Sequence, residues 1–223
     1  MNVRTGKALL RGESGVSAVE FALSLPVLLA IGGYGVEVAN LALTQLRVSQ
    51  AALYLADTAS RVGLTSALTT KQLRESDIND VYFGLAKQGE PIKLTTYGRI
   101  TLSSLEGRAD GTQWLHWQRC IGANNKAGYG SNWDAGTGTA GVTVTSMGDS
   151  GAPVKAPANS GVMFVEINYD YRPLFGTTYV AAQKIRYTAS YIIRDQRDFT
   201  QVYSPGTKAD CKTTPYLATA NKT

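Results

Sequence analysis

One long apolar segment near the N-terminus constrains this sequence more than any other feature. Residues 16–46 carry only two charges, Glu20 and Glu37, and residues 21–36 carry none. Those sixteen uncharged residues would span roughly 24 Å as a helix, and the five residues before them extend the length to roughly 31 Å. This is about the hydrocarbon thickness of a bilayer, so the segment predicts a single membrane-spanning helix.

The charges that precede this segment predict its orientation. Arg4, Lys7 and Arg11 lie just before the apolar residues. Basic residues next to a span are retained on the cytoplasmic side of the membrane. We therefore expect the N-terminus in the cytoplasm and everything after the helix on the outer side.

A removable secretory signal is an alternative for the same residues, but the sequence that follows argues against it. Such a signal needs a small-x-small cleavage site, which Leu-Leu-Ala at residues 28–30 supplies poorly. The helical pattern instead continues from Val36 to Val62 without proline or glycine, and Gly63 is a suitable terminator. The sequence thus predicts one continuous helix over residues 16–63. The apolar positions of its second half recur at three-and-four spacing: Val36, Val38, Leu41, Leu43, Leu46, Val48, Ala51, Ala52, Leu55 and Ala59.

A plain, uncut anchor is a second alternative, but it gives no role to Glu20. A carboxylate in the apolar layer is costly unless it is paired, so it suggests function. If the chain is cut after Gly15, the new amino group of Val16 lies one helical turn from Glu20 and partly neutralises it. Gly15 also leaves the scissile peptide uncrowded. Together with Phe21, these residues predict a processing site in a subunit that assembles laterally through its helix.

Lateral assembly needs helices that approach closely, and small residues permit this. Pro26 removes one backbone hydrogen bond inside the helix and permits a kink. The small residues that we expect at helix–helix contacts are Ala18, Ala22, Gly32, Gly33 and Gly35.

The string R-G-E-S-G-V-S-A-V-E-F-A-L-S-L-P-V-L-L at residues 11–29, followed by Glu37 and the amphipathic helix, resembles TadE-type proteins. These are minor pilins, or pseudopilins, of the bacterial tight-adherence (Tad/Flp) type IV pilus. The resemblance implies that a prepilin peptidase cuts after Gly15 and removes residues 1–15 as a leader. Val16 would then be the mature N-terminus, with Glu20 and Phe21 at the recognised fifth and sixth positions.

The resemblance also implies where the protein lies and what it contacts. It implies a single-pass protein of the bacterial inner membrane, with residues 64–223 as a periplasmic pilin-like domain that can enter the extracellular pilus. The implied partners are the prepilin peptidase, other minor pilins, the major pilin, the inner-membrane assembly platform and membrane lipid. Two alternatives remain open, an uncut bitopic periplasmic anchor or binding protein and a type II secretion pseudopilin.

The residues after the long helix predict an α+β domain. A second helix is expected at residues 70–87. Residues 98–105, 113–121, 162–171 and 184–194 alternate as half-buried antiparallel strands do. Residues 122–161 read as a surface excursion with a short strand at 142–145, and residues 195–223 as an irregular tail. We expect one face of a sheet of about four strands to cover the amphipathic helix, and the other face to meet solvent or neighbouring subunits.

Cys120 and Cys211 leave two interpretations open. In an oxidising compartment they would form a disulfide, and otherwise they are buried or free thiols. With a single histidine, His116, and no metal-type cysteine spacing, we expect neither a metal site nor a cofactor. The net charge of +5 forms no basic stripe with interleaved aromatic residues, so no nucleic-acid partner is expected.

One motif suggests an enzyme. Residues 148–153, Gly-Asp-Ser-Gly-Ala-Pro, resemble the nucleophile loop of chymotrypsin-like proteases, with Ser150 as the nucleophile. A working triad also needs a histidine within reach, and His116 lies between two tryptophans in a predicted strand. We therefore expect no enzymatic activity. Asp77, Asn79 and Asp80 lack the twelve-residue pattern of a calcium loop and are interpreted as a solvated helix face.

Overall fold

The computed structural model describes residues 13–65, 70–135 and 141–212. The chain divides into two compact units. One contains residues 1–42 together with residues 172–182, and the other contains residues 43–171 and 183–223. Most of the predicted leader, residues 1–12, lies outside the described residues.

The first element is the long helix α1, Glu13–Arg61, which is a single 49-residue helix with Pro26 inside it. It begins three residues before the predicted start and ends two residues before the predicted end. Gly63 follows with a backbone φ of 136°, a conformation that L side chains rarely adopt, and it ends the helix as expected. The absence of a break between the apolar and amphipathic halves confirms the prediction of one continuous helix.

The C-terminal half of α1 buries one stripe of small and aliphatic side chains and packs against the antiparallel sheet. The spacing of these residues is that of one face of an amphipathic helix. The stripe is Val48, Ala51, Ala52, Leu55, Ala56 and Ala59, each at most 2% exposed. On a neighbouring face, Tyr54 lies against Gly84 of helix α2, Glu75–Gln88, where a Cβ would come within 2.4 Å of the tyrosine hydroxyl.

Two cations hold the C-terminus of α1. The buried Arg197 donates from Nη1 to the carbonyl of Ala59 at 3.1 Å and from Nη2 to that of Ser60 at 2.8 Å. Lys71 Nζ donates to the carbonyl of Arg61 at 2.6 Å. The last carbonyls of a helix have no partner within it, so these three bonds satisfy groups that would otherwise be unpaired.

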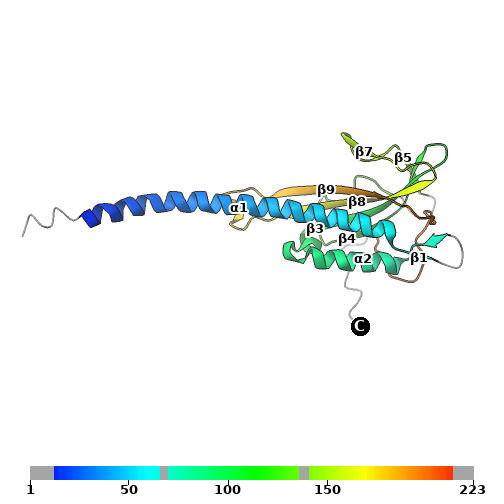
Figure 1. Ribbon diagram of the computed structural model, residues 1–223, viewed down its shortest axis with the longest axis horizontal. Helices are drawn as coiled ribbons and strands as arrows, with labels where there is room; N and C mark the ends of the chain where they lie inside the picture. The colour runs from blue at the N-terminus through cyan, green and yellow to red at the C-terminus, as the bar shows by residue number, and fades with distance from the viewer. Residues whose placement is uncertain (1–12, 66–69, 136–140, 213–223) are drawn as a thin grey trace, which may run out of the picture. The chain divides into compact units, whose positions relative to one another are not determined.

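The main sheet has five antiparallel strands in the order β5-β4-β3-β8-β9 (Figure 1). In the register of its centre, Ile100 lies opposite Ile121 on one side and Ile167 on the other. The four long strands were all predicted, and the fifth is the short strand expected near residue 142. The strands are β3 Gly98–Gly107, β4 Gln113–Ile121, β5 Val142–Val144, β8 Ser160–Tyr171 and β9 Gln183–Ile192.

The remaining elements are short. Helix α2 begins five residues later than predicted, because β2 occupies the start of the expected helix. The others are β1 Leu64–Thr65 paired with β2 Lys71–Gln72, the 3-10 helices η1 Glu90–Ile92 and η2 Gly176–Thr178, helix α3 Leu94–Tyr97, and the hairpin of β6 Met147–Asp149 and β7 Ala152–Val154.

The expectation that the second face of the sheet meets solvent or neighbouring subunits is wrong. Eleven of the twelve residues of β8 are buried, and only Ser160 is intermediate. The excursion after β4 folds back over this face and builds a second core upon it. That core consists of Leu105, Leu115, Ala135, Met147, Ala156, Val162 and Phe164, with Trp133, Val144 and Val154 packed against it.

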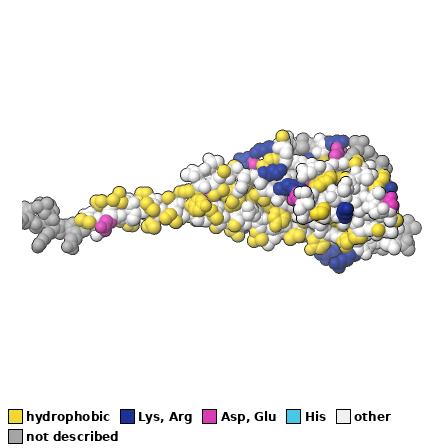
Figure 2. All heavy atoms as spheres, turned by 90° about the horizontal axis from the view of Figure 1, so that it is seen from above, with side chains coloured by type: hydrophobic (Ala, Val, Ile, Leu, Met, Phe, Trp, Pro, Cys, Tyr) yellow, Lys and Arg dark blue, Asp and Glu magenta, His cyan; other side chains and the backbone are white. Residues whose placement is uncertain are grey.

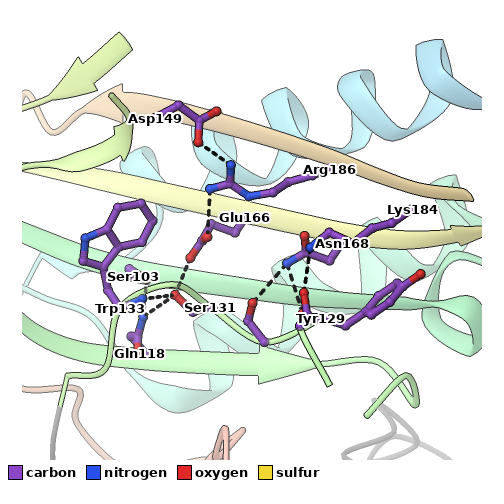
Figure 3. Close-up of polar contacts among 12 residues, drawn as sticks. Ser103, Gln118, Tyr129, Ser131, Trp133, Asp149, Glu166, Asn168, Lys184 and Arg186 are labelled. Atoms are coloured by element: carbon purple, nitrogen blue, oxygen red, sulfur yellow. Dashed lines mark hydrogen bonds and ion pairs between the residues drawn. The ribbon is translucent and has the colours of Figure 1, made fainter. Parts of the chain in front are cut away.

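Polar side chains of β8 fix the excursion in place (Figure 3). Glu166 accepts a hydrogen bond from the Ser131 hydroxyl and lies 3.4 Å from Nη2 of Arg186. Asn168 Nδ2 donates to the carbonyls of Tyr129 at 3.0 Å and Gly130 at 3.2 Å. Burial raises the pKa of the Glu166 carboxyl, and the Ser131 and Arg186 contacts offset only part of that rise. In the sequence pattern these polar side chains are expected to face solvent. In the structure they form hydrogen bonds that hold the segment after β4 against the sheet.

A disulfide pins the tail to the sheet. Cys120 in β4 is bonded to Cys211, 91 residues later, so of the two interpretations left open by the sequence the structure has the bridge. The backbone N–H of Cys120 also donates to the carbonyl of Ala209 at 2.9 Å, and Arg99 Nη2 donates to the carbonyl of Cys211 at 2.5 Å. No named strand or helix lies between Ile192 and residue 212, which agrees with the predicted irregular tail.

Candidate functional site: the apolar half of α1

The N-terminal half of α1 exposes nearly all of its apolar side chains. It is the one helix in the described part of the chain that is long and apolar enough to cross a membrane, and none of its most apolar window is buried inside the protein. Figure 2 shows hydrophobic side chains along this part of the helix. Val16, Leu23 and Ile31 are 62%, 72% and 65% exposed. Such a surface is stable in lipid or against other helices, and unfavourable in water.

The predicted processing residues lie in the first turns of this helix. Gly15 is exposed and has no other atom near the position of a Cβ. Val16 and Phe21 are exposed too, at 62% and 61%. Glu20 is exposed, and no ion pair joins it to another residue in the described ranges. The structure therefore places the four residues together on an accessible helix start, while cleavage itself stays a prediction.

The small residues expected at helix–helix contacts differ in their surroundings. A Cβ added to Gly32 or Gly35 would meet nothing within 4 Å, so both leave the helix surface open to a close neighbour. Gly33 is already covered by its own chain, because the ring of Tyr179 lies 2.9 Å from the position of such a Cβ. Ala18 and Ala22 are exposed. No pattern in the sequence indicates that the loop after β8 covers Gly33.

Glu37 has a structural role that its position in the sequence did not indicate. It is fully buried, although it follows directly after the exposed apolar residues. Its two carboxylate oxygens accept hydrogen bonds from the backbone N–H of Leu174, at 3.1 and 3.0 Å, and one of them accepts from that of Phe175 at 3.1 Å. Backbone N–H groups stabilise a carboxylate that is removed from water. The sequence shows an acid at the end of an apolar run, which marks Glu37 as unusual. It does not indicate that the partners of Glu37 are the backbone N–H groups of Leu174 and Phe175.

The residues that suggested a protease have other contacts. His116 is buried in β4 with Nε2 2.5 Å from Oε2 of Glu106, although the two groups are not aligned for a hydrogen bond. Ser150 is exposed in the turn between β6 and β7.

The residues that suggested calcium ligation also have other contacts. Asp77 accepts hydrogen bonds from the side chain and backbone of Arg74, and Asn79 donates to the carbonyl of Thr207. Among the described residues, no group of three or more His, Cys, Asp or Glu side chains could hold a metal ion.

Comparison with known protein families gives a match to the long helix. Residues 15–56 match the family model of TadE-like proteins. Neither the curated proteins nor the solved structures gave a significant match to the chain. The matched range covers the exposed apolar half of α1 and most of its amphipathic half. The chain is thus similar to TadE-like proteins over most of the helix that could span a membrane.

Proposed function

We propose that this protein is a minor pilin or pseudopilin of a tight-adherence type IV pilus. In this proposal α1 inserts the chain in the inner membrane, with the N-terminus in the cytoplasm and the sheet domain in the periplasm. A prepilin peptidase removes residues 1–15. The protein then joins or primes a pilus by packing its helix beside those of other minor pilins and the major pilin, on the inner-membrane assembly platform. We propose no catalytic role.

One observation carries the proposal. A single helix runs without a break from an exposed apolar half of membrane length into an amphipathic half that packs against a sheet. A secretory signal has no use for such an extension, whereas a subunit that is drawn out of the membrane by its helix needs it. The TadE-like match to residues 15–56 favours the tight-adherence system over a type II secretion pseudopilin. The Cys120–Cys211 disulfide suits an oxidising periplasm.

The processing step can be tested by the mass of the protein. The full chain is expressed with and without the cognate prepilin peptidase, and the intact mass and N-terminal sequence are measured. We expect the peptidase to yield a chain that is fifteen residues shorter and begins at Val16. The variant Gly15→Val should stay uncut, because a branched side chain crowds the scissile peptide.

A matched control separates this effect from general damage to the leader. Gly12→Val makes the same substitution three residues upstream, and it should be cut like the unmodified chain. A protein that keeps Met1 in the presence of active peptidase would contradict the pilin proposal and favour an uncut periplasmic anchor. Genes for a secretion ATPase and a prepilin peptidase beside this gene would identify the machine to which the protein belongs.

A further inference from the structure

We propose that the loop between β8 and β9, residues 172–182, is an interfacial membrane anchor. It would seat Leu174 and Phe175 in the headgroup boundary on the outer side of the bilayer that α1 spans. The inference rests on the proposed spanning of the membrane by α1. It goes beyond pilus assembly, because it assigns a lipid contact to a segment more than 130 residues after Glu37, the α1 residue that it contacts.

The loop is fixed to one short stretch of α1. The backbone N–H groups of Leu174 and Phe175 donate to the carboxylate of Glu37, and the ring of Tyr179 covers Gly33. These two contacts lie one helical turn apart on the same side of α1. Both belong to the same compact unit, which joins residues 1–42 with residues 172–182. The loop therefore keeps a fixed depth along the helix.

That depth coincides with the expected edge of the hydrocarbon layer. With a rise of 1.5 Å per residue, Gly33 and Glu37 lie about 26 Å and about 32 Å along the helix axis from Val16. The hydrocarbon core is about 30 Å thick. If the apolar half begins near the cytoplasmic face, Glu37 and the loop bound to it lie at the opposite boundary. Aromatic side chains are enriched at that level of membrane proteins.

The surface of the loop suits this position. Leu174 is 61% exposed and Phe175 is 49% exposed, and the Phe175 ring stacks edge-on against Tyr179 with 5.9 Å between their centres. Residues 172–182 contain no acidic residue, and the basic Arg172 lies two residues before Leu174 at the apolar tip. Apolar and aromatic tips flanked by cations bind the boundary between acyl chains and anionic headgroups.

The buried Glu37 explains how such a loop can be held there. An acid exposed to acyl chains would oppose insertion of the helix at this depth. The loop covers that carboxylate with backbone donors and presents hydrocarbon outward in its place. The exposed apolar surface of α1 thereby continues onto Leu174 and Phe175. Lipid is the environment that we propose for that part of α1. This continuity favours lipid over a protein partner as the group that covers the tip.

Depth-dependent fluorescence quenching tests the proposal on the full chain. Both native cysteines are bonded to each other, so a single introduced cysteine can be labelled selectively with an environment-sensitive nitrobenzoxadiazole dye. The protein with Phe175→Cys is reconstituted at low protein-to-lipid ratio in vesicles of phosphatidylcholine and phosphatidylglycerol. The substitution keeps the backbone N–H that binds Glu37. We expect blue-shifted emission and strong quenching by lipids with a spin label near the headgroup.

Two controls make the result interpretable. Phe83 in α2 has the same side chain and nearly the same exposure, 50%, but lies in the other compact unit. A label at Phe83→Cys should behave as in water, with little lipid quenching and ready quenching by iodide. A label at Leu28→Cys on α1 should be quenched best by spin labels deep in the acyl chains. Failure at Leu28 would refute the spanning helix itself, and with it the basis of the proposed function.

The outcomes at position 175 then decide the inference. Water-like emission at 175, with Leu28 deep in the acyl chains, would overturn it and leave the spanning helix intact. Shielding at 175 without lipid quenching, seen only at high protein density, would mean that a neighbouring subunit covers the loop, which also overturns it. A second variant tests the attachment: Glu37→Ala should reduce shallow quenching at 175, whereas Glu37→Gln keeps one acceptor oxygen and should restore part of it.

Discussion

Removal of the disulfide should destabilise the sheet domain strongly. Cys120 and Cys211 close a loop with a sequence separation of 91 residues. For a loop of that length the chain-entropy treatment gives about 4.6 kcal/mol at 25 °C, and measured values commonly fall to about 2–4 kcal/mol. We expect the double variant Cys120→Ala/Cys211→Ala to lose about 3–5 kcal/mol of unfolding free energy. Alanine is chosen because Cys120 is only 2% exposed and a serine hydroxyl would be buried there.

The contacts around the disulfide indicate that its loss would first affect the segment after Ile193. Ala209 is fully buried and accepts the Cys120 N–H, and Arg99 donates to the carbonyl of Cys211. Without the covalent link, these contacts must order the tail unaided, at a cost of about 1–2 kcal/mol of backbone entropy per residue. The tail should therefore release before the sheet melts, and proteolysis of the variant should begin after Ile193.

The assay is guanidinium unfolding of the full chain in mild detergent, followed by tryptophan fluorescence. Trp114 and Trp117 lie in β4, and Trp133 packs in the second core, so all three report on this domain. For a domain of this size the loss corresponds to a fall in Tm of about 6–20 °C. Dithiothreitol should shift the unmodified chain and leave the double variant unchanged. A variant within about 1 kcal/mol of the unmodified chain would refute the reasoning, because the loop closure would then contribute far less than the chain-entropy treatment gives.

Three further predictions concern the same domain and are checked by the same unfolding assay. Arg197→Met should cost about 3 kcal/mol or more, since it removes two charged hydrogen bonds from the buried C-terminus of α1; a loss below about 1 kcal/mol would contradict the capping role. Glu166→Gln should be neutral or stabilising at pH 7. Burial raises the pKa of Glu166 in the folded state, so the native state binds this proton more tightly than the unfolded state does. The unmodified chain should therefore lose stability as pH rises from about 4.3 through that raised pKa. The variant should lack this loss, and a variant with the same pH dependence as the unmodified chain would disprove the role of Glu166. Gly122→Ala should be severely destabilising, because φ is 103° and a Cβ would lie 2.2 Å from the carbonyl oxygen of Gly98, whereas the control Gly130→Ala, with open space, should be tolerated.

Periodicity predicted the elements of this fold well where one period persists. Residues 36–62 keep apolar spacing without proline or glycine and follow directly on the apolar half, so one continuous helix that ends near Gly63 could be predicted. The long strands β3, β4, β8 and β9 alternate, and each was placed within about two residues. The α+β architecture with a sheet on the helix followed from these patterns alone.

The prediction from the sequence was wrong where buried polar residues form hydrogen bonds within the chain. Alternation predicted a half-buried strand at residues 162–171, with the second face of the sheet in solvent or against neighbouring subunits; in β8 that face carries Phe164, Glu166 and Asn168. The structure covers that face with residues from 124–135 and 144–156, whose glycine-rich and serine-rich composition looked like a surface excursion. Ser131 and the carbonyls of Tyr129 and Gly130 form hydrogen bonds with Glu166 and Asn168. These bonds offset the free-energy cost of removing the two polar side chains from water. Pairing across such sequence distances leaves no local pattern.

The two acids of the apolar segment show the same limit and point to different roles. Both looked alike in the sequence, as costly charges in a membrane-length helix. Glu37 is fully buried, and its oxygens are occupied by backbone donors of its own chain. Glu20 is exposed near the start of α1, and none of the described residues forms an ion pair with it. A carboxylate satisfied within the chain can position a loop, but it has little left to offer a neighbour. We therefore infer that Glu20 is the acid left to meet a positive charge created by processing or carried by another subunit, and that Glu37 serves the architecture of this chain.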